Sequence, residues 1–463
     1  MSDALWTSDE LATATGGRVV GGSFVVEGVS IDSRDVGVGD LFVALAGVRD
    51  GHEFATGALA SGAAAVLASK PIDGPHVLVD DTFTALEKLG VAARQRNKGR
   101  RAAVTGSVGK TSVTQAVAAG LKLAGRWHSS VKSYNNHIGV PLTLARMPRD
   151  TERAVFEIGM NHSDEITPLS RFVRPHVAAI TTVGPVHIEN FPDGEAGVAR
   201  AKAEIFAGLE PGGVAVLNAD NPWFGLLKAE AETVGATVRS FGTGADVDAR
   251  LTGFEAREGH AMVHAVLDGE ALSFPLLQTG LHWGLNSLCV LLTLEAMAVS
   301  RGTALAALEG FAPLAGRGAE KSIEIAGGAF TLIDESYNAN PISMDAAFRT
   351  LGARDTSGRR IVALTDMLEL GDRAAHFHAG LAAPIEAADI DLVFCAGPLM
   401  KSLWDALPPT RRGGYAETAG DLAPDVAQAM RPGDLVMVKG SNGSRASTIA
   451  AALAALDRGV GEG

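Results

Sequence analysis

The sequence predicts an α/β protein of three domains, with a doubly wound parallel sheet in the central domain. The chain has 463 residues, more than one hydrophobic core usually serves. Between residues 99 and 314, apolar stretches alternate with helical patterns, an order typical of βαβ units. One apolar stretch leads into a glycine-containing loop and then a helix. Together these features favour a central nucleotide-binding sheet with a smaller domain on each side.

The first predicted domain covers residues 1–98 and is a small α/β domain. Glycine turns separate its apolar stretches, and a helical stretch at residues 84–96 closes it. We expect its strands at residues 25–26, 41–45, 64–67 and 77–79.

The second predicted domain covers residues 99–314 and carries the doubly wound sheet. We expect its strands at residues 102–105, 153–158, 177–182, 214–218 and 237–241, and helices at 113–124, 194–209 and 281–299. The polar, glycine-containing stretch 249–277 predicts hairpins added to the sheet. Because ligands bind at the carboxyl ends of parallel strands, we expect the site at that edge.

The third predicted domain covers residues 315–463 and is a smaller, Rossmann-like α/β domain. We expect its strands at residues 330–334, 360–364, 392–395 and 435–439. Polar loops at residues 334–341, 365–371 and 439–444 follow three of them. Such residues are common in plain turns, but three loops at corresponding strand ends also favour ligand binding.

A loop between an apolar strand and a helix predicts a phosphate-binding site. It consists of Thr105, Gly106, Ser107, Val108, Gly109, Lys110, Thr111 and Ser112. Glycines let backbone N–H groups face phosphate oxygens, and the helix N-terminus adds a favourable dipole. Lys110 would reach the β- and γ-phosphates, and the Thr111 or Ser112 hydroxyl could bind Mg²⁺. The general pattern has glycine where Val104 stands, so the alternative is a strand-to-helix turn with an exposed lysine.

Three other residues of this domain have two interpretations each. Glu157 ends a predicted strand, where a carboxylate either holds Mg²⁺ or is a surface charge, and the nearby loop favours the metal. His187 follows the strand at 177–182 and is either a surface residue or a ligand. Lys202 lies within a helical pattern, which by itself indicates a solvated lysine.

Composition limits the class of partner and the compartment. The net charge of −13 argues against nucleic acid as the main partner. No apolar run approaches the ~20 residues of a membrane span, and the acidic start does not fit a signal peptide. Cys289 and Cys395 lie far apart without a metal-ligand pattern, which indicates buried thiols in a reducing compartment. We therefore expect a cytoplasmic protein. The sequence does not indicate an oligomer, so a monomer is the default expectation.

In these motifs the sequence resembles the Mur ligase family, ATP-dependent enzymes that join amino acids to the peptidoglycan precursor. Its loop at 105–112 is similar to the family's TGTxGKT[TS] form, which has no upstream glycine. The resemblance extends over the whole chain, in order. It includes residues 32–34, 39–45, 50–52, 156–159, His187, Lys202 and residues 280–286.

Within the family, residues 133–143 and 337–344 resemble the members that join D-alanyl-D-alanine to UDP-N-acetylmuramoyl-tripeptide. His137 departs from their pattern, which carries glutamate there, and we assign it no role. The resemblance implies that ATP phosphorylates the tripeptide's terminal carboxylate. The dipeptide amine then attacks the acyl phosphate, and ADP and phosphate are released.

The resemblance also implies roles for single residues. Lys110, His187 and Lys202 would be catalytic, and the whole loop 105–112 would bind ATP. Thr111 and Glu157 would hold Mg²⁺, while His187 would hold a second Mg²⁺ together with Lys202, if that lysine is carbamylated. A carbamate is an anionic oxygen ligand, which an ammonium is not. The other implied nucleotide contacts are His282, Asn286, Asn338 and, near the phosphates, Arg317.

The outer domains would bring the two other substrates. Ser33 and Arg34 are the implied contacts of the UDP group, and Lys439 and Ser441 are candidates on the dipeptide side. Ligands from three domains imply closure before chemistry, with hinges near residues 98–101 and 313–317.

Two alternatives belong to different classes of function. One is another amide ligase of the superfamily, such as the enzyme that adds the third amino acid, or folylpolyglutamate synthase. The folate enzymes lack a uridine-binding N-terminal domain, which disfavours them. The other is a P-loop NTPase or regulatory binding module, which would hydrolyse ATP without an acceptor and gives no reason for Glu157, His187 and Lys202.

Overall fold

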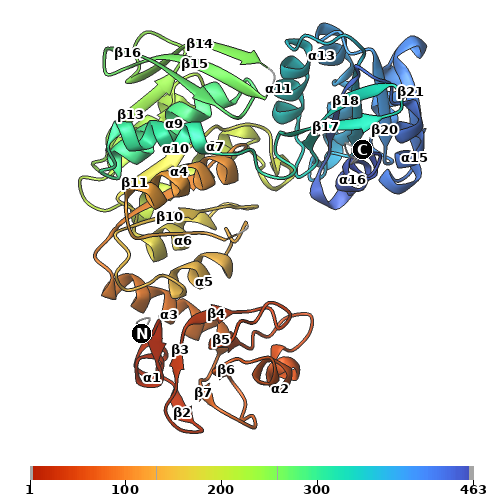
Figure 1. Ribbon diagram of the computed structural model, residues 1–463. Coiled ribbons are helices and arrows are strands. Elements are labelled where there is room, and N and C mark those ends of the chain that lie inside the picture. Colours follow the sequence, from red (N-terminus) through yellow and green to blue (C-terminus); the bar gives the residue numbers. More distant parts are fainter. Residues whose placement is uncertain (1–3, 132, 258, 458–463) are drawn as a thin grey trace, which may run out of the picture.

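The structure is a computed structural model that describes residues 4–131, 133–257 and 259–457. Figure 1 shows three bodies along the chain, with the N-terminal body below the central one and the C-terminal body beside it. Each body has its own sheet of mainly parallel strands with helices packed against it. The predicted α/β class is therefore confirmed.

The N-terminal body is built on a short, mainly parallel sheet. In spatial order its strands are β2 (Arg18–Val20), β7 (His76–Leu78), β6 (Ala65–Ala68), β5 (Asp40–Val43) and β4 (Gly28–Ser30). Its helices are α1 (Ser8–Thr15), α2 (Ala55–Ala60) and α3 (Thr82–Arg96), and β1 (Trp6–Thr7) pairs with β3 (Val25–Val26). The predicted strands are present. Helix α1 was not predicted, although Thr7 and Glu10 form a capping box at its start.

The central sheet is the largest, and its parallel part holds the predicted phosphate loop. In spatial order its strands are β16 (Glu270–Leu276), β15 (His260–Leu267), β14 (Ala249–Arg257), β13 (Thr237–Gly242), β12 (Val214–Asn218), β11 (Val177–Ile180), β8 (Arg100–Thr105), β10 (Arg153–Glu157) and β9 (Trp127–Ser129). Neighbouring strands from β9 to β14 are parallel, and β14 to β16 form the antiparallel hairpins expected at 249–277. The three-residue β9 was not predicted.

The central sheet is doubly wound, and its inner strands β8, β10, β11 and β12 are apolar on both faces. Along β8, Ala102 and Val104 pack into one hydrophobic cluster and Ala103 into another. The first face is covered by α4 (Lys110–Ala124), α9 (Trp283–Ala296) and α10 (Arg301–Gly310). The second face is covered by α5 (Gly139–Ala145), α6 (Ile166–Val173), α7 (Glu195–Ala203) and α8 (Phe224–Thr233). Such burial leaves only the strand ends for polar chemistry.

The helix expected at 194–209 is shorter in the structure. Helix α7 ends at Ala203, and a 3-10 turn covers Glu204–Gly208. A side chain at Gly208 would start 2.1 Å from the Ser170 carbonyl oxygen. The Glu204 carboxylate accepts hydrogen bonds from backbone N–H groups at the start of α6. These tertiary contacts override the helical pattern.

The C-terminal body has a parallel sheet with one antiparallel edge strand. In spatial order its strands are β17 (Ala319–Ile325), β18 (Gly328–Glu335), β22 (Leu435–Lys439), β19 (Arg360–Thr365), β20 (Leu392–Ala396) and β21 (Arg412–Ala416). Its helices are α11 (Pro341–Gly352), α12 (Ala374–Ala379), α13 (Ala382–Ala387), α14 (Lys401–Ala406), α15 (Ala419–Ala429) and α16 (Ser447–Ala454). The predicted strands are present. Both edge strands, β17 and β21, escaped prediction because they are polar or glycine-containing.

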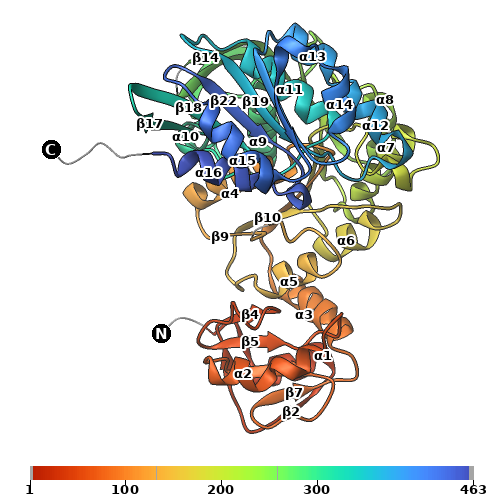
Figure 2. The same ribbon diagram turned by 90° about the vertical axis from the view of Figure 1, so that its right-hand side faces the viewer.

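Helix α5 joins the N-terminal and central bodies. Its residues Leu142 and Ala145 lie in the N-terminal hydrophobic core, while its other face packs against the central sheet. The Trp6 indole donates a hydrogen bond to the Ala145 carbonyl (2.9 Å), and the Arg146 guanidinium donates one to the Val29 carbonyl (2.6 Å). Figures 1 and 2 both show α3 and α5 at this junction.

Side-chain hydrogen bonds fix the segment around residues 98–101, where we expected the first hinge. The Asn97 amide donates to the Thr151 carbonyl at 2.8 Å, and a Cβ at Gly99 would lie 2.4 Å from that same oxygen. Arg101 is 6 % exposed, and its guanidinium donates to the Val173 carbonyl. Residues 97–101 are therefore tied to the central body.

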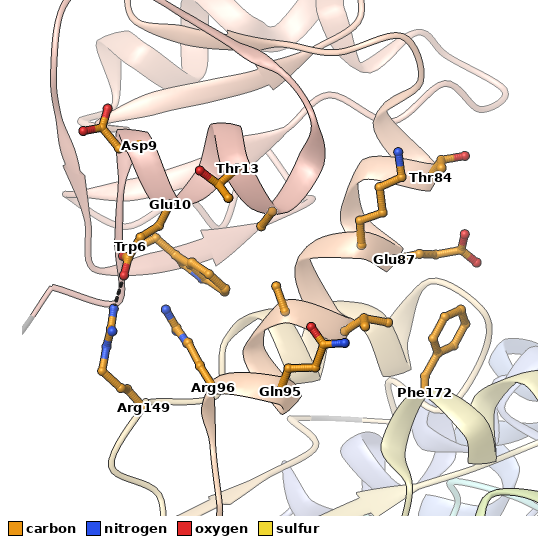
Figure 3. Close-up of a pocket in the computed structure, with 14 residues that line it drawn as sticks. Trp6, Asp9, Glu10, Thr13, Thr84, Glu87, Gln95, Arg96, Arg149 and Phe172 are labelled. Carbon is orange, nitrogen blue, oxygen red and sulfur yellow. Dashed lines mark hydrogen bonds and ion pairs between the residues drawn. The ribbon is translucent and has the colours of Figure 1, made fainter.

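A cavity of about 720 Å³ lies beside this junction, between α1 and α3. Figure 3 shows Arg96 and Arg149 beneath Trp6, and Arg149 forms an ion pair with Glu10. The Arg96 guanidinium stacks 3.5 Å from the centre of the Trp6 ring. None of the lining residues is a predicted site residue.

The structure also answers two questions raised by the composition, namely membrane-spanning helices and the state of the two cysteines. Within the described ranges, no helix is long and apolar enough to cross a membrane. Cys289 and Cys395 are both buried free thiols, and burial raises the pKa of each to about 12.

We predict that Gly90→Ala destabilises the junction between α3 and α5. The new Cβ would lie 2.9 Å from the Pro141 carbonyl oxygen, so we expect a loss of about 1–3 kcal/mol in the free energy of unfolding. Gly57→Ala in α2 is the matched control, because nothing lies within 4 Å of its new Cβ. Urea denaturation should show Gly57→Ala unchanged or stabilised. Equal midpoints for the two variants would contradict the close crossing.

Candidate active site

The predicted phosphate loop connects β8 to α4 at the carboxyl edge of the central sheet. Gly106 has φ 151°, and a Cβ there would lie 1.9 Å from the Thr181 hydroxyl oxygen. Gly109 is the N-cap of α4 with φ 87°, and it has no side chain that could cap the first turn. Val104, which stands where the general pattern has glycine, is fully buried within the sheet. The loop therefore presents the start of α4, a favourable position for an anion.

Lys110 lies inside this loop rather than in solvent. Its ammonium donates a hydrogen bond to the Gly106 carbonyl at 2.7 Å. Burial lowers the pKa of Lys110, the Glu157 carboxylate opposes that shift, and the Arg317 charge adds to it. The alternative of an exposed turn lysine does not fit this arrangement.

Glu157 ends β10 and is 1 % exposed. One carboxylate oxygen accepts a hydrogen bond from the Asn135 amide at 2.7 Å. The other is buried and has no hydrogen-bond partner within the described part of the chain. An unpaired buried carboxylate oxygen is costly, and a hard cation would satisfy it. The residue therefore fits the predicted metal role better than a surface charge.

His187 and Lys202 lie close enough to Lys110 for their charges to interact. Lys202 is 2 % exposed, so the solvated helical lysine that its pattern indicates is wrong. Burial, followed by repulsion from Lys110, lowers the pKa of Lys202 well below its ordinary value. Burial and the charges of Lys110 and Lys202 lower the pKa of His187 to about 4. These basic side chains form one group beside the loop, and the lowered pKa values of His187 and Lys202 favour their neutral forms.

Arg317 brings the C-terminal body to the phosphate loop. Its guanidinium donates to the Thr111 hydroxyl at 3.1 Å and lies 4.0 Å from the centre of the Tyr337 ring. The Tyr337 hydroxyl lies 2.8 Å from the Ser133 hydroxyl of the central body. Two contacts between bodies thus meet beside the loop.

The other implied nucleotide contacts lie at the same junction. Asn286, on α9, faces Gly109, since a Cβ on that glycine would lie 3.2 Å from the Asn286 amide oxygen. His282 is close enough to Glu335 and Lys439 for their charges to act on its pKa, which burial lowers. Asn338 is exposed in the loop after β18.

The side chains of Lys439 and Ser441 form hydrogen bonds within the C-terminal body. Lys439 is 2 % exposed, and its ammonium donates to Glu335 at 2.9 Å and to the Asn338 carbonyl at 3.2 Å. The Ser441 hydroxyl accepts from the backbone N–H of Leu368. Both side chains thus shape the loops after β18 and β19, and their proposed dipeptide contact stays a prediction.

Ser33 and Arg34 lie apart from this site, in the loop after β4 of the N-terminal body. Arg34 pairs with Asp32 at 2.7 Å, and its side chain is 88 % exposed. An exposed arginine at the carboxyl end of a parallel sheet can meet a phosphate, but it cannot take part in the central site.

Sequence reasoning missed several residues that complete the site. Asn135 and Glu335 hold Glu157 and Lys439 through the contacts above. The Thr181 hydroxyl packs against Gly106 and donates a hydrogen bond to the Val108 carbonyl of the loop. Glu369 of the C-terminal body pairs with His187 at 2.7 Å. Asn135 and Glu335 lie in motifs that carry the resemblance, but their partners are distant in sequence and no spacing pattern could pair them.

Comparison with known proteins matches each body to one family. The Mur ligase family catalytic domain matches residues 25–97, the Mur ligase middle domain 104–294, and the Mur ligase glutamate ligase domain 323–442. The UDP-N-acetylmuramoyl-tripeptide–D-alanyl-D-alanine ligase of Bacillus subtilis (strain 168) is 33% identical over 92% of each chain. This chain belongs to the Mur ligase family.

Two other Mur ligases also match this chain over most of its length. The Escherichia coli (strain K12) protein of the same name is 36% identical over 84% of this chain and 86% of its own. The crystal structure of MurF from Acinetobacter baumannii superimposes with a TM-score of 0.85 and 28% identity, covering 97% of this chain and 99% of that one. The resemblance to the family and the fold it implied are thus confirmed.

We predict that Gly106→Ala lowers the affinity for ADP at least tenfold, or about 1.4 kcal/mol. The added Cβ would overlap the Thr181 hydroxyl and strain a backbone that only glycine adopts readily. Isothermal titration calorimetry measures the affinity, and thermal unfolding checks that the variant is folded. Gly302→Ala, with nothing within 4 Å of its new Cβ, is the control. Equal ADP affinities in both variants would contradict the loop's role.

Proposed function

We propose that this chain is an ATP-dependent ligase that joins D-alanyl-D-alanine to UDP-N-acetylmuramoyl-tripeptide in peptidoglycan synthesis. The observation that carries the proposal is the match, over nearly the whole chain, to relatives that bear the name of this activity. Lys110 and Arg317, which meet at the phosphate loop, support a reaction between two anions, a nucleotide triphosphate and a carboxylate.

The reaction proceeds in two steps, and each step forms one bond and breaks another. A carboxylate oxygen of the tripeptide attacks the γ-phosphorus of ATP, and the bond to the β-phosphate oxygen breaks, which gives an acyl phosphate and ADP. The dipeptide amine then attacks the acyl carbon, the tetrahedral intermediate releases phosphate, and the nitrogen loses its proton. Catalysis here is mainly positioning and charge stabilisation.

The phosphate loop and its neighbours perform the first step. Backbone N–H groups of residues 106–112 bind the β- and γ-phosphates, and Lys110 stabilises the charge that develops on them. Arg317 adds a cation from the C-terminal body, near Thr111. His282, Asn286 and Asn338 hold the adenosine in the junction between the bodies.

The residues also fit Mg²⁺. Thr111 and Glu157 would hold one ion, and His187 with a carbamylated Lys202 a second. The ions would offset the repulsion between phosphate and carboxylate. The unpaired buried oxygen of Glu157 supports the first site.

Carbamylation of Lys202 has physical support. Only an unprotonated amine adds to CO₂, and the lowered pKa of Lys202 favours that form. The modification would also place an anion beside Lys110, where the attraction between opposite charges is favourable.

The outer bodies would bring the other substrates. Ser33 and Arg34 would hold the UDP group, and the C-terminal body the dipeptide, with movement at residues 313–317. The enzyme would act as a cytoplasmic monomer, and its two buried free thiols support a reducing compartment.

Release of phosphate tests the reaction. The full chain is incubated with ATP, Mg²⁺ and the UDP-linked tripeptide, with and without D-alanyl-D-alanine. We expect release to depend on the dipeptide. Equal rates would refute ligation and favour a P-loop ATPase. A faster reaction with single amino acids would indicate another amide ligase of the family.

We predict that Lys202→Ala and Lys202→Arg both lose most activity. Arginine keeps a positive charge but forms no stable carbamate, so it separates charge from modification. In addition, ¹³C NMR of the wild-type chain with ¹³C-labelled bicarbonate should show a carbamate signal that is absent from Lys202→Arg. Full activity in either variant would contradict the proposal.

A further inference from the structure

Tyr337 of the C-terminal body contacts both the Arg317 side chain and the central body. The central carbon of the Arg317 guanidinium lies 4.0 Å from the centre of the Tyr337 ring, a distance typical of a cation–π contact. The Tyr337 hydroxyl lies 2.8 Å from the Ser133 hydroxyl, in the loop after β9, and the two form a hydrogen bond. Because Tyr337 is 37% exposed, these contacts, rather than burial in a hydrophobic core, hold its ring.

The backbone places Arg317 beside this ring but does not fix its side chain. The Tyr337 N–H donates to the Gly316 carbonyl at 3.0 Å, and the Gly318 N–H donates to the Asp334 carbonyl at 2.8 Å. The two glycines have φ 70° and 91°, a conformation that glycine adopts readily. A Cβ at Gly316 would lie 3.1 Å from the Tyr337 Cβ. A long side chain on such a turn still has several rotamers, so its direction depends on its contacts.

The charge of Arg317 is directed at the phosphate loop. Its guanidinium donates to the Thr111 hydroxyl at 3.1 Å, and its charge contributes to the lowered pKa of Lys110. It forms no ion pair with the carboxylates that the structure describes. A cation without a carboxylate partner at the start of α4 is available to an anion bound there.

We propose that Tyr337 is a positioning residue whose ring holds the Arg317 guanidinium at the phosphate loop and whose hydroxyl ties that ring to Ser133. Contact of Arg317 with the γ-phosphate of ATP rests on the proposed function, whereas the arrangement of the side chains does not. The loop that carries Ser133 also carries Asn135, whose amide donates to Glu157 at 2.7 Å. Tyr337 thus connects the cation of the C-terminal body with the segment that supports Glu157.

Nucleotide affinities test the proposal without the ligase reaction. Isothermal titration calorimetry on the full chain with Mg²⁺ compares ADP with AMP-PNP, a triphosphate that resists hydrolysis. Tyr337→Leu removes the aromatic face, so we expect its affinity for AMP-PNP to fall about three- to tenfold. The affinity for ADP should stay within about twofold, because ADP lacks the γ-phosphate. Tyr337→Phe keeps the ring and should retain most of the preference for AMP-PNP.

Double-mutant cycles separate positioning from a merely structural role. Arg317→Met removes the charge but keeps a long side chain. If Tyr337 acts through Arg317, adding Tyr337→Leu to Arg317→Met should change the AMP-PNP affinity less than about twofold. Ser133→Ala and Tyr337→Phe should cause equally small losses, with no further loss in combination, because both remove the same hydrogen bond.

Tyr415→Leu is the matched control. Tyr415 lies on β21, at the edge of the sheet opposite to β17 and β18, and the Lys401 ammonium lies 5.8 Å from the centre of its ring. This variant also loses an aromatic ring beside a cation, and both affinities should stay unchanged. Thermal unfolding checks that each variant is folded.

Several outcomes would overturn the proposal. They are equal losses of ADP and AMP-PNP affinity in Tyr337→Leu, additive effects of Tyr337→Leu and Arg317→Met, and a loss in Tyr337→Phe as large as in Tyr337→Leu. An AMP-PNP affinity that Arg317→Met leaves unchanged would also overturn it. If the wild type shows no phosphate release that depends on the dipeptide, the proposed function fails. The affinities would still decide whether Tyr337 positions Arg317.

Discussion

Burial of positive charge at the carboxyl edge of the central sheet is the constraint on which the site depends. Lys110 and Lys202 lie close together, and burial lowers the pKa of both. Arg317 adds a further positive charge beside Lys110, whereas the Glu157 carboxylate opposes it. Desolvated like charges are unfavourable unless an anion neutralises them or one of them loses its proton. A polyphosphate would do the first, and the proposed modification of Lys202 would achieve the second. The buried positive charges that destabilise the site without a ligand would therefore stabilise it when a polyphosphate is bound.

The sheet explains why these groups lie at its edge. The inner parallel strands β8, β10, β11 and β12 are apolar on both faces, because helices cover each face. Polar groups such as Glu157 can therefore stand only where a strand ends. The C-terminal sheet follows the same rule, and its buried Glu335–Lys439 pair also lies at strand ends. The two edges meet at Arg317 and Thr111, so each body provides half of one site.

The sequence allowed prediction of what depends on local pattern. The loop at 105–112, the alternating strands and Glu157 all follow from spacing along one stretch of chain. The burial of Lys202 did not follow from local pattern, because it depends on packing around α7. The helical pattern around Lys202 by itself indicates a solvated residue. The edge strands β9, β17 and β21 were not predicted, because they are short or polar. The Glu369–His187 contact joins residues from two sheets, and no local signal encodes such a pairing.

Helix α5 makes the molecule less modular than its three sheets suggest. Leu142 and Ala145 belong to the N-terminal core although they follow β8 in the chain, and Asn97 is bonded to Thr151 across the supposed joint. A helix of the central body therefore completes the hydrophobic core of the N-terminal body. A fragment that began at residue 99 would expose Leu142 and Ala145 of α5 to water. During synthesis, the N-terminal body can complete its core only after the ribosome has released residues 139–145, so the two bodies must mature together.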